Sequence, residues 1–373
     1  MKFLILTHVE HKLHNGQYFG YGPYVKEMNL WFEFVTEVVV VAPLLPEQTL
    51  NPIDLPYIHP SLRFVEVPPI NLLTWKSRFQ TALHLPGIFL TVFKEMRRAD
   101  HLHLRCPGNM GLVASFAQIF FPGKKKTAKY AGNWDPSSLQ PFSYRLQQKL
   151  LSNQALTKNM NVLVYGDWQP NNRNLKPFFT ATYFEKEVKN TPPRPLLGPL
   201  KLIFVGTLSS GKNPLVSCQT VFFLKQQGID CSLQLYGEGP EREKIERFAL
   251  DNSLQEVIHL HGNVKADQLK DEYATSHFLL FASSSEGWPK AVAEAMFWGC
   301  IPITTRVSCV PEMIGQGSRG VLVEPDPKKM CNEIVNLLQN PDRYNQLSQE
   351  AMDWSRQFTM EQFKSEIKKL IQN

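Results

Sequence analysis

The chain has 373 residues, of which 43% are apolar and 20% are charged, values typical of a soluble globular protein. No run of about 18 apolar residues occurs, and the apolar start KFLIL is too short for a secretory signal, so we expect neither a membrane span nor export. The length allows two domains of ordinary size in a cytoplasmic protein.

Positive charge is concentrated in the first half of the chain. Residues 1–200 carry 22 Lys and Arg against 13 Asp and Glu, a net charge of +9, whereas residues 201–373 carry 18 against 21, a net charge of −3. This asymmetry indicates an anionic partner for the first half. In NLLTWKSRF, Trp75 and Phe79 flank two cations, and Lys124–Lys126 adds three more. Two interpretations stay open: contact with an anionic membrane, or a solvated basic face above packed aromatic residues.

Metal and disulfide chemistry are not expected. The six cysteines show no C-x-x-C spacing and have apolar neighbours, so we interpret them as reduced, packed thiols. They are Cys106, Cys218, Cys231, Cys300, Cys309 and Cys331. No D-x-D sequence or His/Cys/Asp cluster has ligand spacing, so we predict no metal and no cofactor. No nucleic-acid partner is expected either.

Strand-like and helical stretches alternate along the whole chain. In the first half, strand-like runs occur at 2–6, 37–43, 62–68, 101–104, 126–132 and 161–167, and helical stretches include 77–99 and 141–159. A Pro-rich, charged segment without periodicity follows and indicates a linker. The second half has strand-like runs at 201–206, 231–237, 257–262, 277–284, 300–305 and 320–325.

This alternation predicts an α/β protein with two Rossmann-like, doubly wound domains that face a central cleft. We place the first domain at residues 1–185, the linker at 186–199 and the second domain at 200–355. A helix at 356–373 is expected to pack back on the first domain. Because ligands of open α/β sheets bind beyond the carboxyl ends of the strands, the residues directly after each strand are the candidates for a site.

The stretch KLIFVGTLSSGKNP predicts a strand, a turn and the start of a helix. Its Gly206-x4-Gly211-Lys212 sequence is one residue short of the phosphate loop of nucleoside-triphosphate hydrolases, because Asn213 replaces the Ser or Thr that binds Mg²⁺. No later strand ends in the Asp that such an enzyme needs, so we reject that class. Lys212 near a helix start, with Pro214 in its first turn, still favours phosphate binding. Taken alone, the motif fits a solvated loop lysine equally well.

Two glutamates follow the fourth strand of the second half. Glu286 stands in a tight turn, and Glu294 lies two turns into the helix predicted from PKAVAEAMFWG. Carboxylates suit sugar hydroxyls, and the backbone amides of Gly287, Trp288 and Lys290 suit a hydroxyl or a phosphate. The spacing of eight residues is weak evidence by itself, because it is common by chance.

The second half resembles the retaining glycosyltransferases of family 4, which have the GT-B fold. Five segments occur in the family's order: FVGTLSSGKNPL, LQLYGEGPEREKIE, VIHLHGNV, EGWPKAVAEAM and VPEMIGQGSRGVLVEPDP. The first half resembles the family only in architecture, as expected of a domain that binds varied acceptors. The resemblance implies transfer of a sugar from a nucleotide-diphosphate donor, expected to be UDP-linked, to a glycan or lipid-linked acceptor in surface polysaccharide or glycoconjugate synthesis.

The resemblance also implies roles by position. Glu286 would bind the donor sugar, Glu294 would bind the ribose, and Lys212 would hold the diphosphate and stabilise the leaving group. The other donor-site candidates are Gly206, Thr207, Gly237, Asn263, Val264, Gly287, Trp288 and Lys290. The β-phosphate of the donor would take the acceptor proton, with retention of configuration.

Thr207 departs from the family's pattern, because the family often has Arg at this position. One diphosphate cation is therefore missing, or is supplied by Arg105 or, as the weaker candidate, by Arg173. Arg105 fits a structural ion pair equally well. The missing cation also keeps a second function open, a catalytically idle GT-B scaffold that binds a sugar nucleotide or a partner.

Two further segments of the first half are candidates for the cleft. Gly20 and Gly22, before a predicted helix, resemble the glycine-rich first loop of GT-B enzymes. Asn133 and Asp135 stand where the family usually places a His near the sugar. For these two residues, packing and helix N-capping by Asp135 is an equal alternative.

Overall fold

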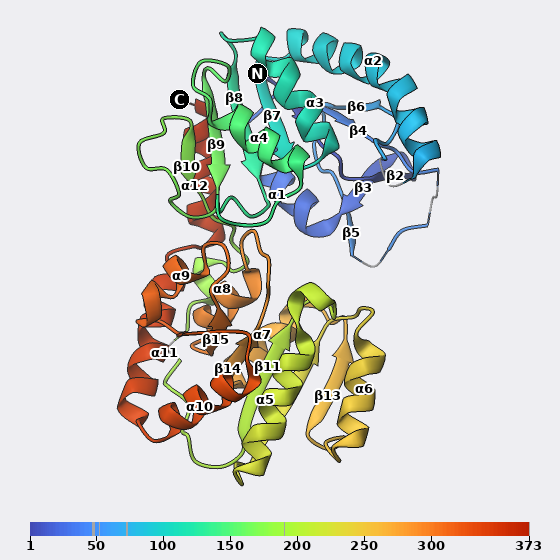
Figure 1. The fold of residues 1–373 in the computed structure, drawn as a ribbon. Helices are drawn as coiled ribbons and strands as arrows, with labels where there is room; N and C mark the ends of the chain where they lie inside the picture. Colours follow the sequence, from blue (N-terminus) through green and yellow to red (C-terminus); the bar gives the residue numbers. More distant parts are fainter. Residues whose placement is uncertain (47–48, 52, 72–73, 190, 373) are drawn as a thin grey trace. The chain divides into compact units, whose positions relative to one another are not determined.

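The computed structural model describes residues 1–46, 49–51, 53–71, 74–189 and 191–372. These residues form two compact units (Figure 1). The first comprises Met1–Phe179 together with the residues from Phe363 onward, and the second comprises Thr180–Gln362. Each unit contains a parallel sheet covered by helices, so the predicted α/β class with two Rossmann-like domains is confirmed.

The first unit is built on a seven-stranded parallel sheet with the order β10-β9-β8-β7-β1-β4-β6. Strands β1 and β4 are almost continuously apolar, as expected where helices cover both faces of a sheet, whereas β7 and β8 also carry His, Lys and Arg side chains. The strands are β1 (Lys2–Leu6), β4 (Glu37–Ala42), β6 (Leu62–Glu66), β7 (His101–Cys106), β8 (Lys125–Tyr130), β9 (Met160–Val164) and β10 (Leu175–Pro177). The helices are α1 (Gly22–Phe32), α2 (Trp75–Arg98), α3 (Asn109–Ala117), η1 (Gln118–Phe120) and α4 (Phe142–Ser152).

A small antiparallel sheet, which the sequence did not indicate, accompanies the first unit. Its order is β2-β3-β5, with β2 (His11–His14), β3 (Gln17–Tyr21) and β5 (Asp54–Pro56). The strands have three to five residues, too few for a clear alternation of apolar and polar positions. The helix expected over 141–159 is also shorter than predicted, because α4 ends at Ser152.

The second unit is built on a six-stranded parallel sheet with the order β13-β12-β11-β14-β15-β16. The strands are β11 (Leu200–Val205), β12 (Cys231–Tyr236), β13 (Ile258–Gly262), β14 (Phe278–Phe281), β15 (Ile301–Thr305) and β16 (Val321–Val323). The helices are η2 (Glu185–Glu187), η3 (Ser210–Lys212), α5 (Pro214–Gln226), α6 (Arg242–Asp251), α7 (Ala266–Thr275), α8 (Lys290–Phe297), α9 (Val310–Met313), η4 (Gly315–Gly317), α10 (Pro327–Leu338) and α11 (Pro341–Ser355). Each of the six predicted strands is present.

The segment expected as a linker is fixed to the second unit at Arg194. The buried guanidinium donates to four backbone carbonyls, those of Tyr273, Ala274, Trp298 and Gly299. Glu187, just before, forms an ion pair with Lys270. Despite its charge and proline content, the described part of this segment is therefore packed against the second unit and is not a flexible linker.

The last helix, α12 (Met360–Gln372), joins the first unit from Phe363 onward. The ring of Phe363 contacts the rings of Phe178 and Phe179, with centroid distances of 5.5 and 5.7 Å. Lys364 forms an ion pair with Glu33 at the end of α1. Among the described residues, no helix has both the length and the apolar character needed to cross a bilayer.

Candidate active site

The carboxyl ends of β11, β12 and β13 are packed through glycines. The amide of Gly206 donates to the carbonyl of Tyr236 at 3.0 Å, and the amide of Gly237 donates to that of Gly262 at 2.8 Å. Gly237 has φ +139°, and a Cβ atom there would lie 1.9 Å from the carbonyl oxygen of Gly206. Only glycine fits at Gly237, because the backbone that follows β11 approaches it closely.

Lys212 lies in a loop that is fastened to the neighbouring strand β14. Asn213 has a left-handed backbone conformation with φ +49°, and its side-chain amide donates to the carbonyl of Ala282 at 2.9 Å. The amide of Ser284 donates to the carbonyl of Gly211, also at 2.9 Å. Asn213 therefore holds the loop against the end of β14, which is a role that a Ser or Thr of a nucleotide-hydrolase loop does not have.

The structure brings together Lys212 and Glu286, two residues that the sequence separates by 74 positions. Their side chains form an ion pair, and they are 29% and 8% exposed, respectively. The ammonium group of Lys212 also lies 5.6 Å from the centroid of the Phe281 ring. A cation for a phosphate and a carboxylate for a hydroxyl are thus held side by side at the carboxyl edge of the sheet.

Glu294 lies on the second turn of α8, and two hydroxyl groups position its carboxylate. Oε1 accepts from the Thr182 hydroxyl at 2.8 Å, and Oε2 accepts from the Tyr273 hydroxyl at 3.3 Å. Burial, together with the negative charge of Glu294, raises the pKa of Tyr273 well above its usual value, so the phenol keeps its proton. Neither Thr182 nor Tyr273 belongs to a recognisable motif, so sequence reasoning missed both.

The turn between Glu286 and α8 is held on both sides. The carbonyl of Gly287 accepts from the Ser308 hydroxyl at 3.0 Å. The Trp288 ring packs near Trp354 and Phe358, with centroid distances of 6.4 and 5.9 Å. Helix α8 begins at the exposed Lys290, and the amides of Val292 and Ala293 donate to the carbonyl of Pro289, at 3.0 and 3.3 Å. Contacts of the amides of Gly287, Trp288 and Lys290 with a ligand stay predictions.

The remaining donor-site candidates lie at the same edge of the sheet. Thr207 lies two residues after the end of β11 and is exposed, and its carbonyl accepts from the amide of Ser209 at 2.8 Å. Asn263 and Val264 directly follow β13, the first exposed and the second half-buried. Their contacts with a nucleotide stay predictions.

The segment with Gly20 and Gly22 is not the expected loop. It forms a hairpin of β2 and β3, with Gly20 inside β3, and Gly22 is the first residue of α1. A Cβ atom at Gly22 would lie 2.2 Å from the carbonyl oxygen of Ile53. This glycine is explained by the close approach of its own unit's backbone.

The two arginines considered as a second diphosphate cation have different surroundings. The guanidinium of Arg105, in β7, lies 5.3 Å from the centroid of the Tyr24 ring. No carboxylate of a described residue forms an ion pair with it, so the alternative of a structural ion pair is not supported. Arg173 precedes β10 and lines a 460 Å³ cavity at the amino ends of the first unit's strands, with Lys125 and Asn159. Arg173 therefore lies at the amino edge of its sheet, whereas ligands of such sheets bind at the carboxyl edge.

Asn133 and Asp135 form a turn of their own. The buried Asn133 accepts the amide of Asp135 at 2.9 Å, and Asp135 accepts both the amide and the hydroxyl of Ser137, at 2.8 and 2.7 Å. Helix α4 begins only at Phe142. Asp135 therefore caps a turn, and the expectation that it caps a helix is wrong.

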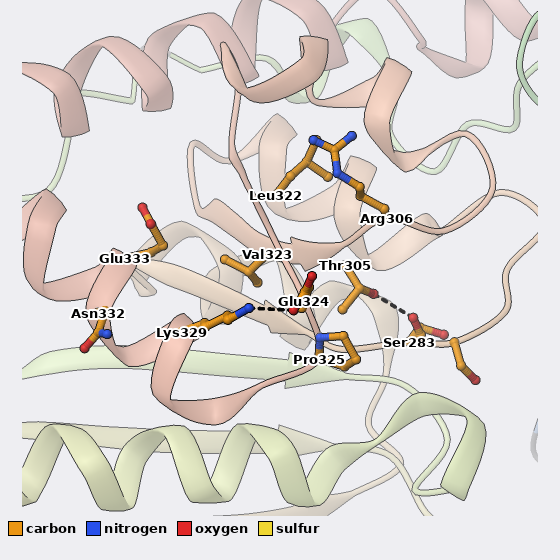
Figure 2. Close-up of a pocket in the computed structure, with 11 residues that line it drawn as sticks. Ser283, Thr305, Arg306, Leu322, Val323, Glu324, Pro325, Lys329, Asn332 and Glu333 are labelled. Atoms are coloured by element: carbon orange, nitrogen blue, oxygen red, sulfur yellow. Dashed lines mark hydrogen bonds and ion pairs between the residues drawn. The ribbon is translucent and has the colours of Figure 1, made fainter.

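A cavity of 610 Å³ lies next to the candidate site, at the ends of β14, β15 and β16. Figure 2 shows the hydroxyl of Thr305 directed at the carbonyl of Ser283, at 2.6 Å, and the ion pair of Lys329 with Glu324 at 2.6 Å. Lys212, Glu286 and Glu294 do not line this cavity. It is therefore a neighbour of the candidate site.

Within the described ranges, no group of three or more His, Cys, Asp or Glu side chains could hold a metal ion.

Comparisons with known proteins find similarity in the second half of the chain. Residues 186–354 match the family described as glycosyl transferases group 1. Over 145 residues the chain is 28% identical to an uncharacterised glycosyltransferase of Methanocaldococcus jannaschii, a match that covers 39% of this chain and 41% of that protein. Over 139 residues it is 30% identical to N-acetyl-alpha-D-glucosaminyl L-malate synthase of Bacillus anthracis, covering 37% and 35%. The matched segment thus spans less than half the length of these relatives.

Solved structures resemble the whole chain. Sucrose-phosphate synthase from Thermosynechococcus elongatus superimposes with a TM-score of 0.68 at 16% identity, covering 100% of this chain and 98% of that one. Anabaena HepE, solved in complex with UDP and glucose, superimposes with a TM-score of 0.67 at 13% identity, covering 100% and 99%. At these identities the likeness establishes the fold.

Proposed function

Because residues 186–354 match the family described as glycosyl transferases group 1, we propose that the protein is a retaining, metal-independent glycosyltransferase with a nucleotide-diphosphate sugar as donor. The donor is a UDP-sugar, and the acceptor is a glycan or a lipid-linked glycan of surface polysaccharide or glycoconjugate synthesis. The protein acts in the cytoplasm, with peripheral contact at the inner face of the membrane. HepE, which binds UDP and glucose in its crystal, supports the choice of UDP.

The pairing of Lys212 with Glu286 is the observation that carries this proposal. The partly exposed lysine suits a diphosphate, and the more deeply buried carboxylate suits sugar hydroxyls. Both follow strand ends of one parallel sheet, where ligands of such sheets bind. Donor binding would replace the ion pair by a lysine–phosphate contact and a carboxylate–hydroxyl contact, so neither charge would lose its partner.

Glu294 would bind the ribose of the donor. Its two oxygens already accept from Thr182 and Tyr273, which fixes the carboxylate while leaving further lone pairs for ribose hydroxyls. Such a site binds a nucleotide without its sugar. Glu294 and Glu286 would therefore serve different parts of the donor.

In the proposed reaction, the acceptor hydroxyl attacks the anomeric carbon on the face from which the diphosphate leaves. The bond from that carbon to the phosphate oxygen breaks as the new glycosidic bond forms, and the β-phosphate takes the hydroxyl proton. Lys212 stabilises the negative charge that develops on the leaving diphosphate. The backbone amides of Gly287, Trp288 and Lys290 add donors at the same edge of the sheet. Arg105 is proposed as the second cation.

A donor screen with Glu294 and Glu286 variants tests the proposal. Wild-type protein should release nucleotide from one or more of a panel of UDP-, GDP- and ADP-sugars. Glu294→Ala should weaken binding of free UDP in calorimetry, because the ribose contact is lost, whereas Glu286→Ala should spare this binding and lower turnover. The exposed Glu256 on the same unit provides a matched control, Glu256→Ala, which should change neither quantity. Equal UDP affinity for wild type and Glu294→Ala would reject the ribose assignment.

The idle-scaffold alternative is favoured by one observation, the presence of Thr207 where a diphosphate arginine is expected. An idle scaffold would bind UDP through Glu294 and Lys212 but would release no nucleotide from any sugar nucleotide, with or without an acceptor mixture. The screen therefore separates the two functions, because both predict UDP binding and only the transferase predicts turnover.

A further inference from the structure

Helix α2 of the first unit has an apolar stripe on its outer side. The side chains of Trp75, Phe79, Leu83 and Leu90 are 83, 68, 65 and 68% exposed. With about 100° of rotation per residue, these four positions fall within an arc of about 80° that runs about 22 Å along the helix. We call these four residues the outer α2 stripe. Helix α2 itself lies along the outside of the first unit (Figure 1).

The core-facing side of α2 lies opposite the outer α2 stripe. Ile88, Val92 and Met96 are buried on that side. The outer stripe is therefore not the exposed margin of a broad buried face. It is a second apolar surface that folding of the first unit leaves in water. Single exposed apolar residues are common on proteins, but a continuous line of large ones marks an interaction surface.

Cations surround the outer α2 stripe. The basic residues of α2 are Lys76, Arg78, Lys94, Arg97 and Arg98. The one carboxylate of the helix, Glu95, is buried and forms ion pairs with Arg63 and Arg98. Lys76 and Lys94 lie on the same flank of the stripe by helical geometry. The guanidinium of Arg78 lies 5.2 Å from the Trp75 ring centroid. An outer face with cations and no exposed carboxylate fits an anionic partner.

The basic run Lys124–Lys126, by contrast, contributes little to this surface. Lys126 is buried and donates to the side chain of Gln118 and the carbonyl of Phe121, and burial lowers its pKa to about 8. The ammonium group of Lys124 donates to the carbonyls of Arg97 and Ala99. The solvent-exposed basic residues behind the charge asymmetry of the sequence therefore lie on α2 rather than in this run.

We infer that the outer α2 stripe docks onto the anionic surface of a lipid bilayer, with the helix lying in the plane of the interface. An interfacial helix of this kind combines a line of Trp, Phe and Leu with flanking Lys and Arg. The long basic side chains reach the lipid phosphates while the stripe enters the headgroup boundary. A second copy of the chain fits less well, because two such helices would bring like charges together.

This inference deepens the membrane contact of the proposed function and rests on it only for the lipid-linked acceptor. A helix held at the bilayer would keep the first unit where such an acceptor is anchored. The binding of lipid and the binding of nucleotide use different units of the protein. The experiment on lipid binding and the experiment on nucleotide binding can therefore contradict one proposal without contradicting the other.

Co-sedimentation with vesicles tests the inference. Wild-type protein should bind vesicles of phosphatidylcholine with phosphatidylglycerol, bind vesicles of phosphatidylcholine alone far less, and lose affinity between low and physiological salt. Phe79→Ser with Leu83→Ser should lower the partition coefficient on the order of 100-fold. Lys76→Gln with Lys94→Gln should lower it roughly 30-fold, from about 1 kcal/mol for each cation.

Matched variants control for a general effect of surface changes. Leu250→Ser removes an equally exposed leucine from α6 of the second unit, and Lys368→Gln removes an exposed lysine from α12. Both should bind vesicles like wild type. Thermal unfolding should show that all variants are folded, and UDP affinity, measured on the same samples, should be unchanged, which keeps the result independent of the donor site.

Three outcomes would overturn the inference. The first is a wild-type protein that ignores anionic vesicles at low salt. The second is a stripe variant that binds them as wild type does. The third is a wild-type dimer in sedimentation velocity that becomes a monomer in the Phe79→Ser, Leu83→Ser variant, which would assign the stripe to a second copy of the chain.

Discussion

The ion pair of Lys212 with Glu286 allows stability and catalysis to be separated in one double-mutant cycle. Exposed pairs contribute up to about 1 kcal/mol, and removal of one partner from a buried pair costs about 3–5 kcal/mol. With side chains 29% and 8% exposed, this pair lies between these limits, so we expect a coupling of about 2 kcal/mol. Lys212→Met should be the costlier single change, because it leaves the more buried group, the carboxylate, without its cation.

Thermal unfolding and steady-state kinetics measure the two effects. For a unit of this size, about 2 kcal/mol corresponds to a shift of roughly 4–8 °C in the unfolding midpoint. The double variant Lys212→Met, Glu286→Gln should recover most of that shift, because no buried charge is left unpaired. It should not recover activity: Lys212→Met lowers kcat/KM by roughly 10²-fold, about 2.7 kcal/mol of transition-state stabilisation, with or without Glu286.

A second ion pair of the same unit serves as the control. Lys201 and Glu272 are 2.7 Å apart with side chains 29% and 25% exposed, and no catalytic role is proposed for them. Their cycle should give a coupling below about 1 kcal/mol and an unchanged kcat/KM. The reasoning fails if the Lys212 and Glu286 changes add without coupling, or if the double variant regains wild-type activity.

Three further predictions follow from the fold and the proposed chemistry. Burial lowers the pKa of His11 and His101 to about 4, below the value of about 6.5 in the unfolded chain. The free energy of unfolding should therefore fall as the pH drops from about 6.5 to about 4. The His101→Gln variant should show a flatter pH dependence in thermal scans, and equal slopes for variant and wild type would contradict this prediction. Gly237→Ala should cost about 3 kcal/mol in urea unfolding, because its Cβ would strike the Gly206 carbonyl, whereas Gly228→Ala, with φ +75° and open space around its Cβ, should cost about 1 kcal/mol. EDTA or added Mg²⁺ should leave nucleotide release from the donor unchanged, since Lys212 supplies the charge; strict Mg²⁺ dependence would reject the metal-independent mechanism.

The positions of the strands could be read from the sequence because burial on both faces leaves a simple pattern. Runs such as EVVVVA and HFLLF are continuously apolar, and the predicted strands of both sheets are present. The hairpin of β2 and β3 could not be predicted, because its strands lack such an apolar pattern. Its short strands mix His, Lys, Gln and Gly, so a glycine in a strand was interpreted as a glycine in a loop.

Solvent exposure of charged residues was less predictable than secondary structure. Lys124, Lys125 and Lys126 are identical in type and adjacent, yet Lys126 is buried because its site offers oxygen acceptors from Gln118 and Phe121. Arg194 lies in a charged, Pro-rich segment and is nevertheless buried, since four backbone carbonyls converge on it. The composition of a segment gives the number of its charged residues, whereas the surrounding backbone decides which of them are exposed to solvent.

By itself the sequence determined the fold class, the order of the strands along the chain and the motif residues Lys212, Glu286 and Glu294. Each of these depends on local pattern or on residue order. Only the tertiary structure decided which residues meet. The ion pair of Lys212 with Glu286 requires β11 and β14 to be neighbours in the sheet, although two strands lie between them in the chain. The contact of Thr182 with Glu294 joins residues 112 positions apart. Such contacts have no sequence signature, since they arise from the packing of separate elements rather than from the spacing within one.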